Sequence, residues 1–178
     1  MQDQLYLNLI AYATTIEGMS KSLDTSKGSL WPLFLTAHAV LVEAIERRLV
    51  LAGLPALAWY DVLWGLERAP RQRLRMSELA DQVVLSRSNL TRLVDRLEDA
   101  GLVQRERSHE DRRGAYAVLT ASGKAVRKSM WPVYAQGIRE LFESQLSDAE
   151  AAAMGASLRR LLTAARAGPL GRLARPRK

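Results

Sequence analysis

The chain has 178 residues, enough for one domain or for one domain with additional helices for oligomerisation. Apolar residues make up 48% and charged residues 25%, and such a composition argues against wholesale disorder. The absence of cysteine excludes disulfide scaffolds, thiolate zinc sites, iron–sulfur clusters and thiol redox switches. The sequence shows no apolar run of the roughly 18 residues that span a membrane and no basic start of a signal peptide, so we expect a cytoplasmic protein without membrane contact.

The net charge of +7 is concentrated at the C-terminal end. Seven of the 26 basic residues lie between Arg159 and Lys178, a stretch without acidic residues, and the other 19 balance the 19 acidic residues. The overall charge is therefore weak evidence for a nucleic-acid-binding face on the body of the protein. We interpret residues 167–178 as a basic flexible tail, with an auxiliary arm for polyanions as the alternative.

The first half of the chain predicts an N-terminal extension and two helices. Residues 1–28 combine a short apolar stretch with glycines and serines, and we expect them to be partly flexible. Ser29 can cap a helix that follows the 3.6-residue period and ends at Gly53. A second helix is predicted from Pro55 to Glu67, because Pro70 prevents it from continuing. A short basic link, residues 71–75, follows.

The middle of the chain predicts a helix, a turn, a second helix and a β-hairpin. Serines cap both helices, and Gly101 ends the second. The predicted segments are a helix over 78–83 capped by Ser77, a helix from Ser86 to Ala100, and strands over 102–107 and 116–119. This order is typical of a winged helix-turn-helix, so we predict a mainly α fold in which residues 54–120 form a DNA-binding domain with a two-stranded wing.

The last part of the chain predicts two more helices. Thr120 caps a long helix that reaches about Ser144, and Trp131–Pro132 is expected to interrupt and kink it. Ser147 and Glu150 have the spacing of a capping box that starts a final helix ending near Ala165. Helices over 29–53 and 121–166 lie outside the winged helix and need another surface to cover their apolar faces. We therefore predict that they form a dimerisation region in a homodimer.

The helix that begins at Ser86 has one apolar and one polar face. At 100° per residue its leucines and Val94 share a stripe, and the opposite face carries Asp95 and Asp99 toward its C-terminal end. Phosphate would repel these two carboxylates, so we expect the N-terminal half to enter the major groove, although an ordinary solvated face is the alternative. The predicted DNA contacts are Ser86, Arg87, Ser88, Asn89, Thr91 and Arg92.

Two further sets of arginines are candidates for DNA contact. Arg112 and Arg113 lie at the predicted hairpin tip, from which a guanidinium can enter the minor groove, and Asp111 can hold Arg113 by a charge-assisted pair. The second set comprises Arg71, Arg73 and Arg75, which suit contacts with DNA phosphates. The alternative is that these arginines belong to a solvated link with no DNA contact.

Together these segments resemble the MarR family of winged helix-turn-helix transcriptional regulators. The resemblance is strong over residues 57–123 and extends over 30–165 in the layout of the helices. Five runs carry it in order and spacing: MSELA from Met76, LTRLVDRLE from Leu90, GLV from Gly101, DRR from Asp111 and LTASG from Leu119. The extension 1–28 and the tail after Gly168 exceed a compact member, and the missing cysteine excludes the thiol-oxidation branch.

The resemblance implies a function and an assembly. Residues Ser86 to Arg92 would start the recognition helix, Asp111 and Arg113 would be the wing pair, and the end helices would intertwine in a homodimer. Such proteins typically repress nearby genes from palindromic operators in double-stranded DNA. A winged helix used only for protein contacts is the alternative, but it needs no paired Asp and Arg at its wing tip.

Many family members release DNA when a small, often phenolic, molecule binds between the dimer and DNA-binding regions. In this chain the corresponding region is rich in aromatic residues, which predict either an apolar slot for a small aromatic effector or plain packing of the dimer core. The second interpretation, which includes a regulator with no effector, is favoured. The candidate residues are Trp31, His38, Trp59, Tyr60 and Trp64, with Trp131 as a further one.

The sequence gives little support to an enzyme. It contains two histidines, neither beside a recognisable serine or carboxylate constellation, and no glycine-rich phosphate loop. His109, Glu110 and Asp111 are neighbours in a tight turn and rarely converge on one ion, so no metal site and no cofactor are expected.

Overall fold

The computed structural model describes residues 30–83, 87–107 and 115–167. These divide into two compact units, with the boundary between Ala135 and Gln136. Several predictions fall outside the described residues: the extension 1–28, the caps Ser29 and Ser86, the wing tip with Asp111, Arg112 and Arg113, and the tail beyond residue 167. Among the described helices, none is long and apolar enough to cross a membrane.

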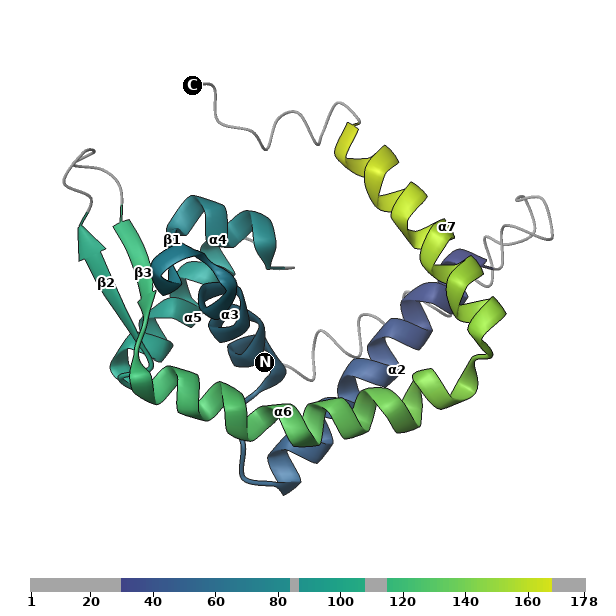
Figure 1. Cartoon of the computed structure of the whole chain (residues 1–178), viewed down its shortest axis with the longest axis horizontal. Coiled ribbons are helices and arrows are strands. Elements are labelled where there is room, and N and C mark those ends of the chain that lie inside the picture. Colours follow the sequence, from purple (N-terminus) through teal and green to yellow (C-terminus); the bar gives the residue numbers. More distant parts are fainter. Residues whose placement is uncertain (1–29, 84–86, 108–114, 168–178) are drawn as a thin grey trace. The chain divides into compact units, whose positions relative to one another are not determined.

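The first unit contains most of the helices and all described strands (Figure 1). Its elements are α2 (Leu30–Leu51), α3 (Leu57–Arg68), a 3-10 turn (Pro70–Gln72), β1 (Arg73–Arg75), α4 (Met76–Gln82), α5 (Arg87–Asp99), β2 (Val103–Arg107), β3 (Ala115–Leu119) and the larger part of α6 (Ala121–Leu141). The second unit holds the end of α6, a 3-10 turn (Glu143–Gln145) and α7 (Asp148–Ala167).

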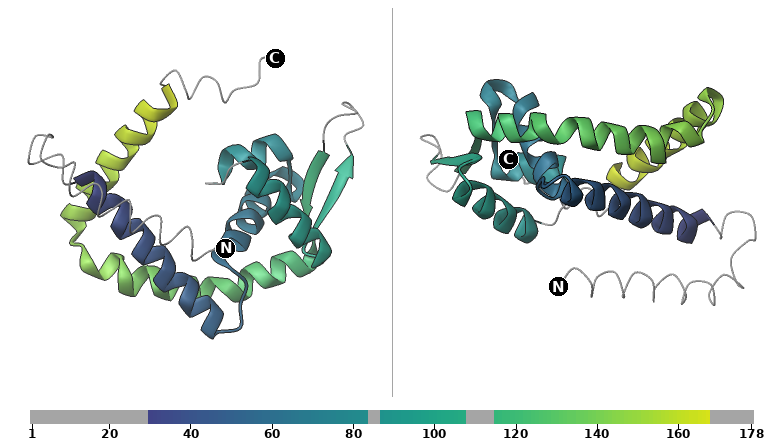
Figure 2. Two further views of the ribbon diagram at one scale, coloured as in Figure 1. Left: turned by 180° about the vertical axis from the view of Figure 1, so that it is seen from behind. Right: turned by 90° about the horizontal axis from the view of Figure 1, so that it is seen from below.

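The sheet has three strands, where the sequence predicted a two-stranded wing. Its order is β1-β3-β2, all antiparallel, and β2 and β3 lie side by side in the left view of Figure 2. The additional strand is β1, which lies in the stretch predicted as a basic link. Leu74 pairs with Ala117 and is buried, while its neighbours Arg73 and Arg75 stay partly exposed. Three residues are too few for alternation to reveal a strand, and only the pairing with β3 defines it.

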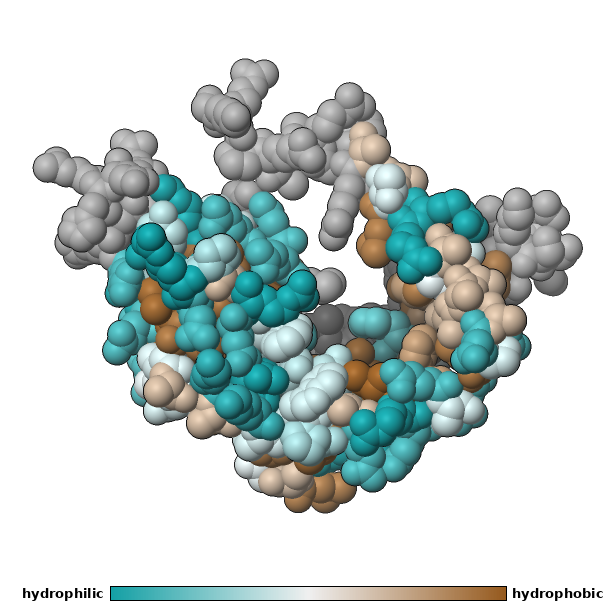
Figure 3. Space-filling view, viewed as in Figure 1, coloured by the Kyte–Doolittle hydropathy of each residue, from teal (hydrophilic) through white to brown (hydrophobic). Residues whose placement is uncertain are grey.

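The hydrophobic core of the first unit is built around α5. Its predicted stripe, Leu90, Leu93, Val94 and Leu97, is at most 2% exposed and confirms the helical period. Against it pack residues from α3, α4 and the sheet, among them Leu63, Leu66, Leu79, Val103 and Ala117. Each buried leucine of this kind stabilises the fold by about 1.5–3 kcal/mol. The face of this part seen in Figure 3 is largely hydrophilic, which leaves the polar side of the winged helix to solvent.

Two glycines end helices as predicted. Gly53 and Gly101 have φ angles of 66° and 71°, a left-handed conformation that glycine adopts without strain. After each glycine the next backbone N–H returns to the last turn, from Leu54 to the carbonyl of Leu49 and from Leu102 to that of Leu97. These paired hydrogen bonds satisfy helix carbonyls that would otherwise lack partners.

Other predicted helix boundaries need correction. α4 begins at Met76, so Ser77 lies inside the helix rather than capping it, and the carboxylate of Glu78 instead accepts the backbone N–H of Arg75 at 2.9 Å. α6 is one helix through Pro132, which therefore does not interrupt it. A helix can contain a proline because the residue removes only one backbone N–H donor and its steric clash affects only the preceding turn.

The capping box at the start of α7 is confirmed. The backbone N–H of Ser147 donates to Glu150 at 2.9 Å, and the N–H of Glu150 approaches the Ser147 hydroxyl at 3.4 Å. The Ser147 hydroxyl also donates to the Glu150 carboxylate at 2.6 Å, and this hydrogen bond, together with the one from the Ser147 backbone N–H, lowers the pKa of Glu150 because both favour its ionised form.

The start of α6 is fixed by a close approach of backbones. The hydroxyl of Thr120 accepts the N–H of Gly123 at 3.0 Å, as a helix cap, and donates to the carbonyl of Gly101 at 2.8 Å. A Cβ atom on Gly123 would overlap the carbonyl oxygen of Leu102 and a methyl group of Leu119. The run LTASG therefore joins α6 to the end of α5, and it requires glycine at its last position.

We expect Gly123→Ala to lower the free energy of unfolding by about 1–3 kcal/mol, because the obstructing atom belongs to backbone and cannot move aside. The matched control is Gly65→Ala in α3, where an added Cβ meets Leu79 in an ordinary contact of 3.6 Å. Alanine is the better helix former, so the control should be neutral or stabilising by up to about 1 kcal/mol. Urea denaturation of both variants measures the difference, and equal stabilities would contradict the close approach.

Candidate nucleic-acid interface and aromatic cluster

The predicted recognition helix, α5, presents its polar side chains to solvent. Asn89, Thr91 and Arg92 are exposed, on the side opposite the buried leucine stripe. Arg87 and Ser88 occupy the first turn of the helix, and their side chains lie outside the described part of the chain, as does Ser86. The described residues thus share one helix face with hydrogen-bonding groups suited to base edges or phosphates.

Asp95, which the sequence analysis treated as a bare acidic charge, is paired. Its carboxylate lies 2.5 Å from a guanidinium nitrogen of Arg105 on β2, and Glu98 lies 3.2 Å from the same nitrogen. The backbone N–H of Arg105 also donates to Glu98 at 3.0 Å. The pairing ties α5 to the wing strand, and it offsets only part of the negative charge that was expected to repel phosphate, because one guanidinium is shared by two carboxylates. Arg105 was missed because a strand arginine acquires a helix partner only in the tertiary structure.

The basic candidates on β1 are held together by a tyrosine. The guanidinium carbon of Arg73 lies 4.4 Å from the centroid of the Tyr116 ring and that of Arg75 lies 5.2 Å from it. Arg71 is not part of this group; it is exposed in the preceding 3-10 turn with a φ angle of 56°. The sequence analysis did not single out Tyr116, because its pairing with β1 was not predicted.

The aromatic candidates for an effector pocket do not form a single group. Trp59 packs against the winged-helix core, and Trp31 is stacked on Phe34 with a centroid distance of 6.2 Å. His38 is exposed on α2. Tyr60 and Trp64 alone among the five lie together, with ring centroids 6.4 Å apart.

Tyr60 is the centre of an aromatic cluster formed by α3 and α6. Its ring is 6.1 Å from Trp131 and 5.0 Å from Tyr134, the latter in an edge-to-face arrangement, and Tyr60 itself is only 4% exposed. Burial raises the pKa of Tyr60 and Tyr134, so both phenols stay neutral at physiological pH. Tyr134 was missed by the sequence analysis, although its spacing of three residues from Trp131 places both on one helix face.

A charged pair borders the aromatic cluster. Arg127 of α6 lies 2.6 Å from a carboxylate oxygen of Glu67 in α3, and both side chains are less than 15% exposed. The guanidinium of Arg127 also lies 5.2 Å from the centre of the Trp64 ring. Lys124 of α6 also approaches Glu67, at 4.0 Å, so two cations of α6 are directed at one largely buried carboxylate of α3 and constrain how α6 packs on the winged helix.

Two carboxylates face each other where α2 leads into α3. Glu46 accepts the first backbone N–H of α3, from Leu57, at 3.0 Å. Partial burial raises the pKa of Glu46, although this hydrogen bond acts in the opposite direction. The pKa of Asp61 is also raised, by partial burial and by the negative charge of Glu46. Among the described residues, no cluster of three or more His, Asp or Glu side chains is arranged to hold a metal ion.

The raised pKa of Asp61 predicts how stability depends on pH. A carboxyl group that binds its proton more tightly in the folded state destabilises the fold once pH rises through its folded pKa, and this cost is absent below its unfolded pKa. Asp61→Asn should therefore stabilise the protein at pH 7, by less than about 1 kcal/mol for a side chain that solvent still reaches. Thermal melting at pH 7 and pH 3 checks this, and a gain that persists unchanged at pH 3 would be inconsistent with it.

The architecture defines a class of protein, the winged helix-turn-helix proteins. The model of the MarR family matches residues 58–114 of the chain. Among solved structures, the chain is similar to Sco3205, a MarR family transcriptional regulator from Streptomyces coelicolor in complex with DNA, with 32% identity and a TM-score of 0.72 over 79% of this chain and 88% of that one. It is also similar to AbsC from the same organism, with 29% identity and a TM-score of 0.75 over 82% of this chain and 98% of that one.

The protein thus belongs to the MarR family of transcriptional regulators. Among curated relatives, the HTH-type transcriptional regulator PrsX of Escherichia coli is 34% identical over 47% of this chain and 57% of its own length. The uncharacterized HTH-type transcriptional regulator YfiV of Bacillus subtilis is 40% identical over 33% of this chain and 36% of its own length. The matches therefore span between about a third and somewhat over half of these curated relatives.

Proposed function

We propose that the protein is a sequence-specific DNA-binding regulator that binds a palindromic operator as a homodimer and represses transcription. The observation that carries the proposal is α5, whose leucine stripe is buried while Asn89, Thr91 and Arg92 are exposed beside a wing. Family membership and the likeness to a regulator solved with DNA support it. The proposed role is one of binding and not of catalysis.

In the proposed complex, the N-terminal half of α5 enters the major groove, where Ser86, Arg87 and Ser88 join the exposed residues of the helix. Asp111, Arg112 and Arg113 of the wing tip address the adjacent minor groove. The C-terminal half of α5 supports this placement, because Arg105 pairs with both Asp95 and Glu98 and only partly offsets their charge, and Asp99 adds a third carboxylate that phosphate would repel.

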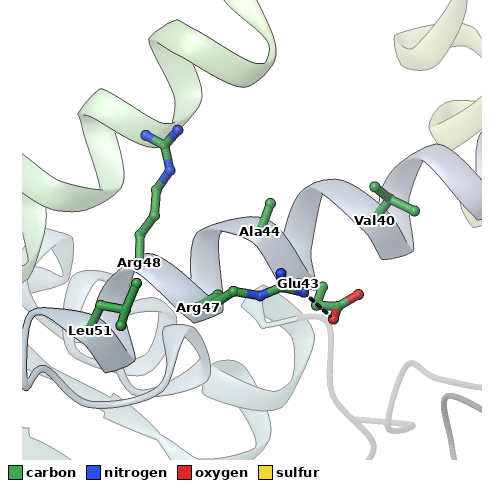
Figure 4. A pocket seen from close by; sticks show the side chains of 6 residues that line it. All are labelled: Val40, Glu43, Ala44, Arg47, Arg48 and Leu51. Atoms are coloured by element: carbon green, nitrogen blue, oxygen red, sulfur yellow. Dashed lines mark hydrogen bonds and ion pairs between the residues drawn. The ribbon is translucent and has the colours of Figure 1, made fainter.

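The proposed homodimer uses residues 29–53 and 121–166. α2 exposes an unusual number of large apolar side chains within the described chain: Leu30, Trp31, Leu33, Phe34, Val40, Val50 and Leu51. A hollow of about 320 Å³ lies along the same helix, with an ion pair of 2.7 Å between Glu43 and Arg47 on its floor (Figure 4). Exposed apolar side chains in such number on one helix are typical of protein interfaces.

Light scattering tests the assembly. At micromolar concentration we expect twice the chain mass of 19.8 kDa, because burying the apolar face of α2 against a second copy is favourable. Val50→Glu or Leu51→Glu should shift the equilibrium toward monomer, since each places a charge in the proposed interface. Gln82→Glu, which adds the same charge at an exposed position of α4 outside residues 29–53 and 121–166, should not. A wild-type protein of single-chain mass would contradict the homodimer.

DNA binding is tested with duplexes selected from a random pool by the wild-type protein. Arg92→Ala and Arg113→Ala should each weaken binding by about 1–3 kcal/mol, the value of one good groove contact. Arg96→Ala is the matched control, because Arg96 lies on the polar side of the same helix one turn further from its N-terminal end. Equal losses at Arg92 and Arg96 would refute the orientation, and a wild-type protein that selects no sequence would favour a module for protein contacts alone.

A small aromatic effector would bind at the aromatic cluster of α3 and α6. We infer that a small aromatic molecule, if it regulates the protein, contacts Tyr60 and Trp64 and not the five predicted residues together, because only these two of the five lie in one cluster. Such a ligand must bind one spacing of the recognition helices better than another to change DNA affinity.

A further inference from the structure

One face of the three-stranded sheet carries two arginines that both contact one tyrosine. We propose that Tyr116 is a positioning residue that holds Arg73 and Arg75 together as a clamp for DNA phosphates, an inference that rests on the proposed DNA-binding function. The sequence already predicted phosphate contacts for both arginines, and the proposal adds Tyr116 as the residue that orients them.

The contacts of Tyr116 differ between its two arginines. Arg73 lies over the ring at 4.4 Å, within the distance of a cation–π interaction. Arg75 lies 5.2 Å from the ring centre and its Nε donates a hydrogen bond to the phenol oxygen at 3.1 Å. One side chain thus holds both guanidinium groups, one by stacking and the other by a hydrogen bond as well.

Strand pairing brings these side chains to one face. Arg75 is directly opposite Tyr116, and Arg73 is two residues away, opposite Val118. Since alternate residues of a strand point to the same face, both arginines share a face while Leu74 between them is buried on the other. Glu106, on the far side of β3, also pairs with Tyr116 in register and lies 3.4 Å from Arg73.

The position in the chain places this face beside the predicted DNA contacts. β1 leads directly into α4, the first helix of the helix-turn-helix, and Tyr116 is the second residue of β3 after the wing tip. Two guanidinium groups accompany a single carboxylate among these four side chains, so the group is net positive. Stacking uses the flat face of a guanidinium and not its N–H edges, so a stacked arginine still donates to phosphate oxygens.

The physical benefit of the tyrosine is preorganisation. A free arginine loses rotamer freedom when it binds a phosphate, and a side chain that already fixes its orientation reduces this loss. Without the ring, both arginines remain on β1 and retain their charges, so the effect concerns how well they are held and not whether they are present.

A double-mutant cycle on the selected operator tests the proposal. Tyr116→Leu should weaken binding about three- to tenfold, and Tyr116→Phe about twofold, because it keeps the ring but loses the hydrogen bond to Arg75. In an Arg73→Met/Arg75→Met background, Tyr116→Leu should have no further effect, since nothing remains to be positioned. Gln104→Ala, an exposed residue that pairs with Val118 in the same sheet, is the control and should bind like wild type.

Salt dependence separates positioning from a structural role. The Arg73→Met/Arg75→Met protein should lose about two units of the slope of log affinity against log salt, and Tyr116→Leu part of that loss. Thermal melting shows which variants are folded. If Tyr116→Leu does not fold, Tyr116→Phe replaces it in the binding measurements. If wild type selects an operator but Tyr116→Leu leaves affinity and slope unchanged, or weakens binding equally in the Met background, the clamp is wrong. A wild-type protein without operator binding would instead remove the proposed function itself.

Discussion

The burial of the leucine stripe of α5 is the constraint on which the rest of the structure depends. The stripe packs against α3, α4 and the sheet, and it comprises Leu90, Leu93, Val94 and Leu97. Its burial allows only one orientation of the helix about its own axis. A rotation that exposed the stripe would cost several buried leucines, each worth about 1.5–3 kcal/mol. The polar side of the helix is therefore directed outward by the core, before any interaction with a ligand is considered.

The sheet orients charged side chains in the same way that the core orients α5. Arg105 faces α5 because its strand alternates inward and outward, and it finds Asp95 and Glu98 one helical turn apart on that side. Arg73 and Arg75 lie on a strand that pairs with β3 and meet Tyr116 there. In each case a cation is oriented by contacts within the protein, so the geometry of the basic surface is set largely before association with a polyanion.

The contact of α6 with the winged helix has a different character. Its first turn is joined to the end of α5 through Thr120 and Gly123, and one to two turns later Arg127 pairs with Glu67 beside Trp64. The aromatic cluster around Tyr60 continues the same contact. Backbone approach, a largely buried ion pair and stacked rings all resist displacement, and a displacement of α6 would therefore be felt at α3 and at the end of α5.

The sequence by itself determined the order of elements, the buried face of α5, the glycines that end α2 and α5, and the family, because these depend on local periodicity, backbone conformation and linear spacing. Only the tertiary structure decided that residues 73–75 form a strand, that Arg105 pairs with Asp95 and Glu98, and which aromatic residues meet. The polar and charged partners lie far apart in the chain, 41 residues for Arg75 and Tyr116 and 60 for Glu67 and Arg127, and their identity follows from strand register and helix packing. Neither is encoded in a local pattern, because each is selected by the burial of the whole core.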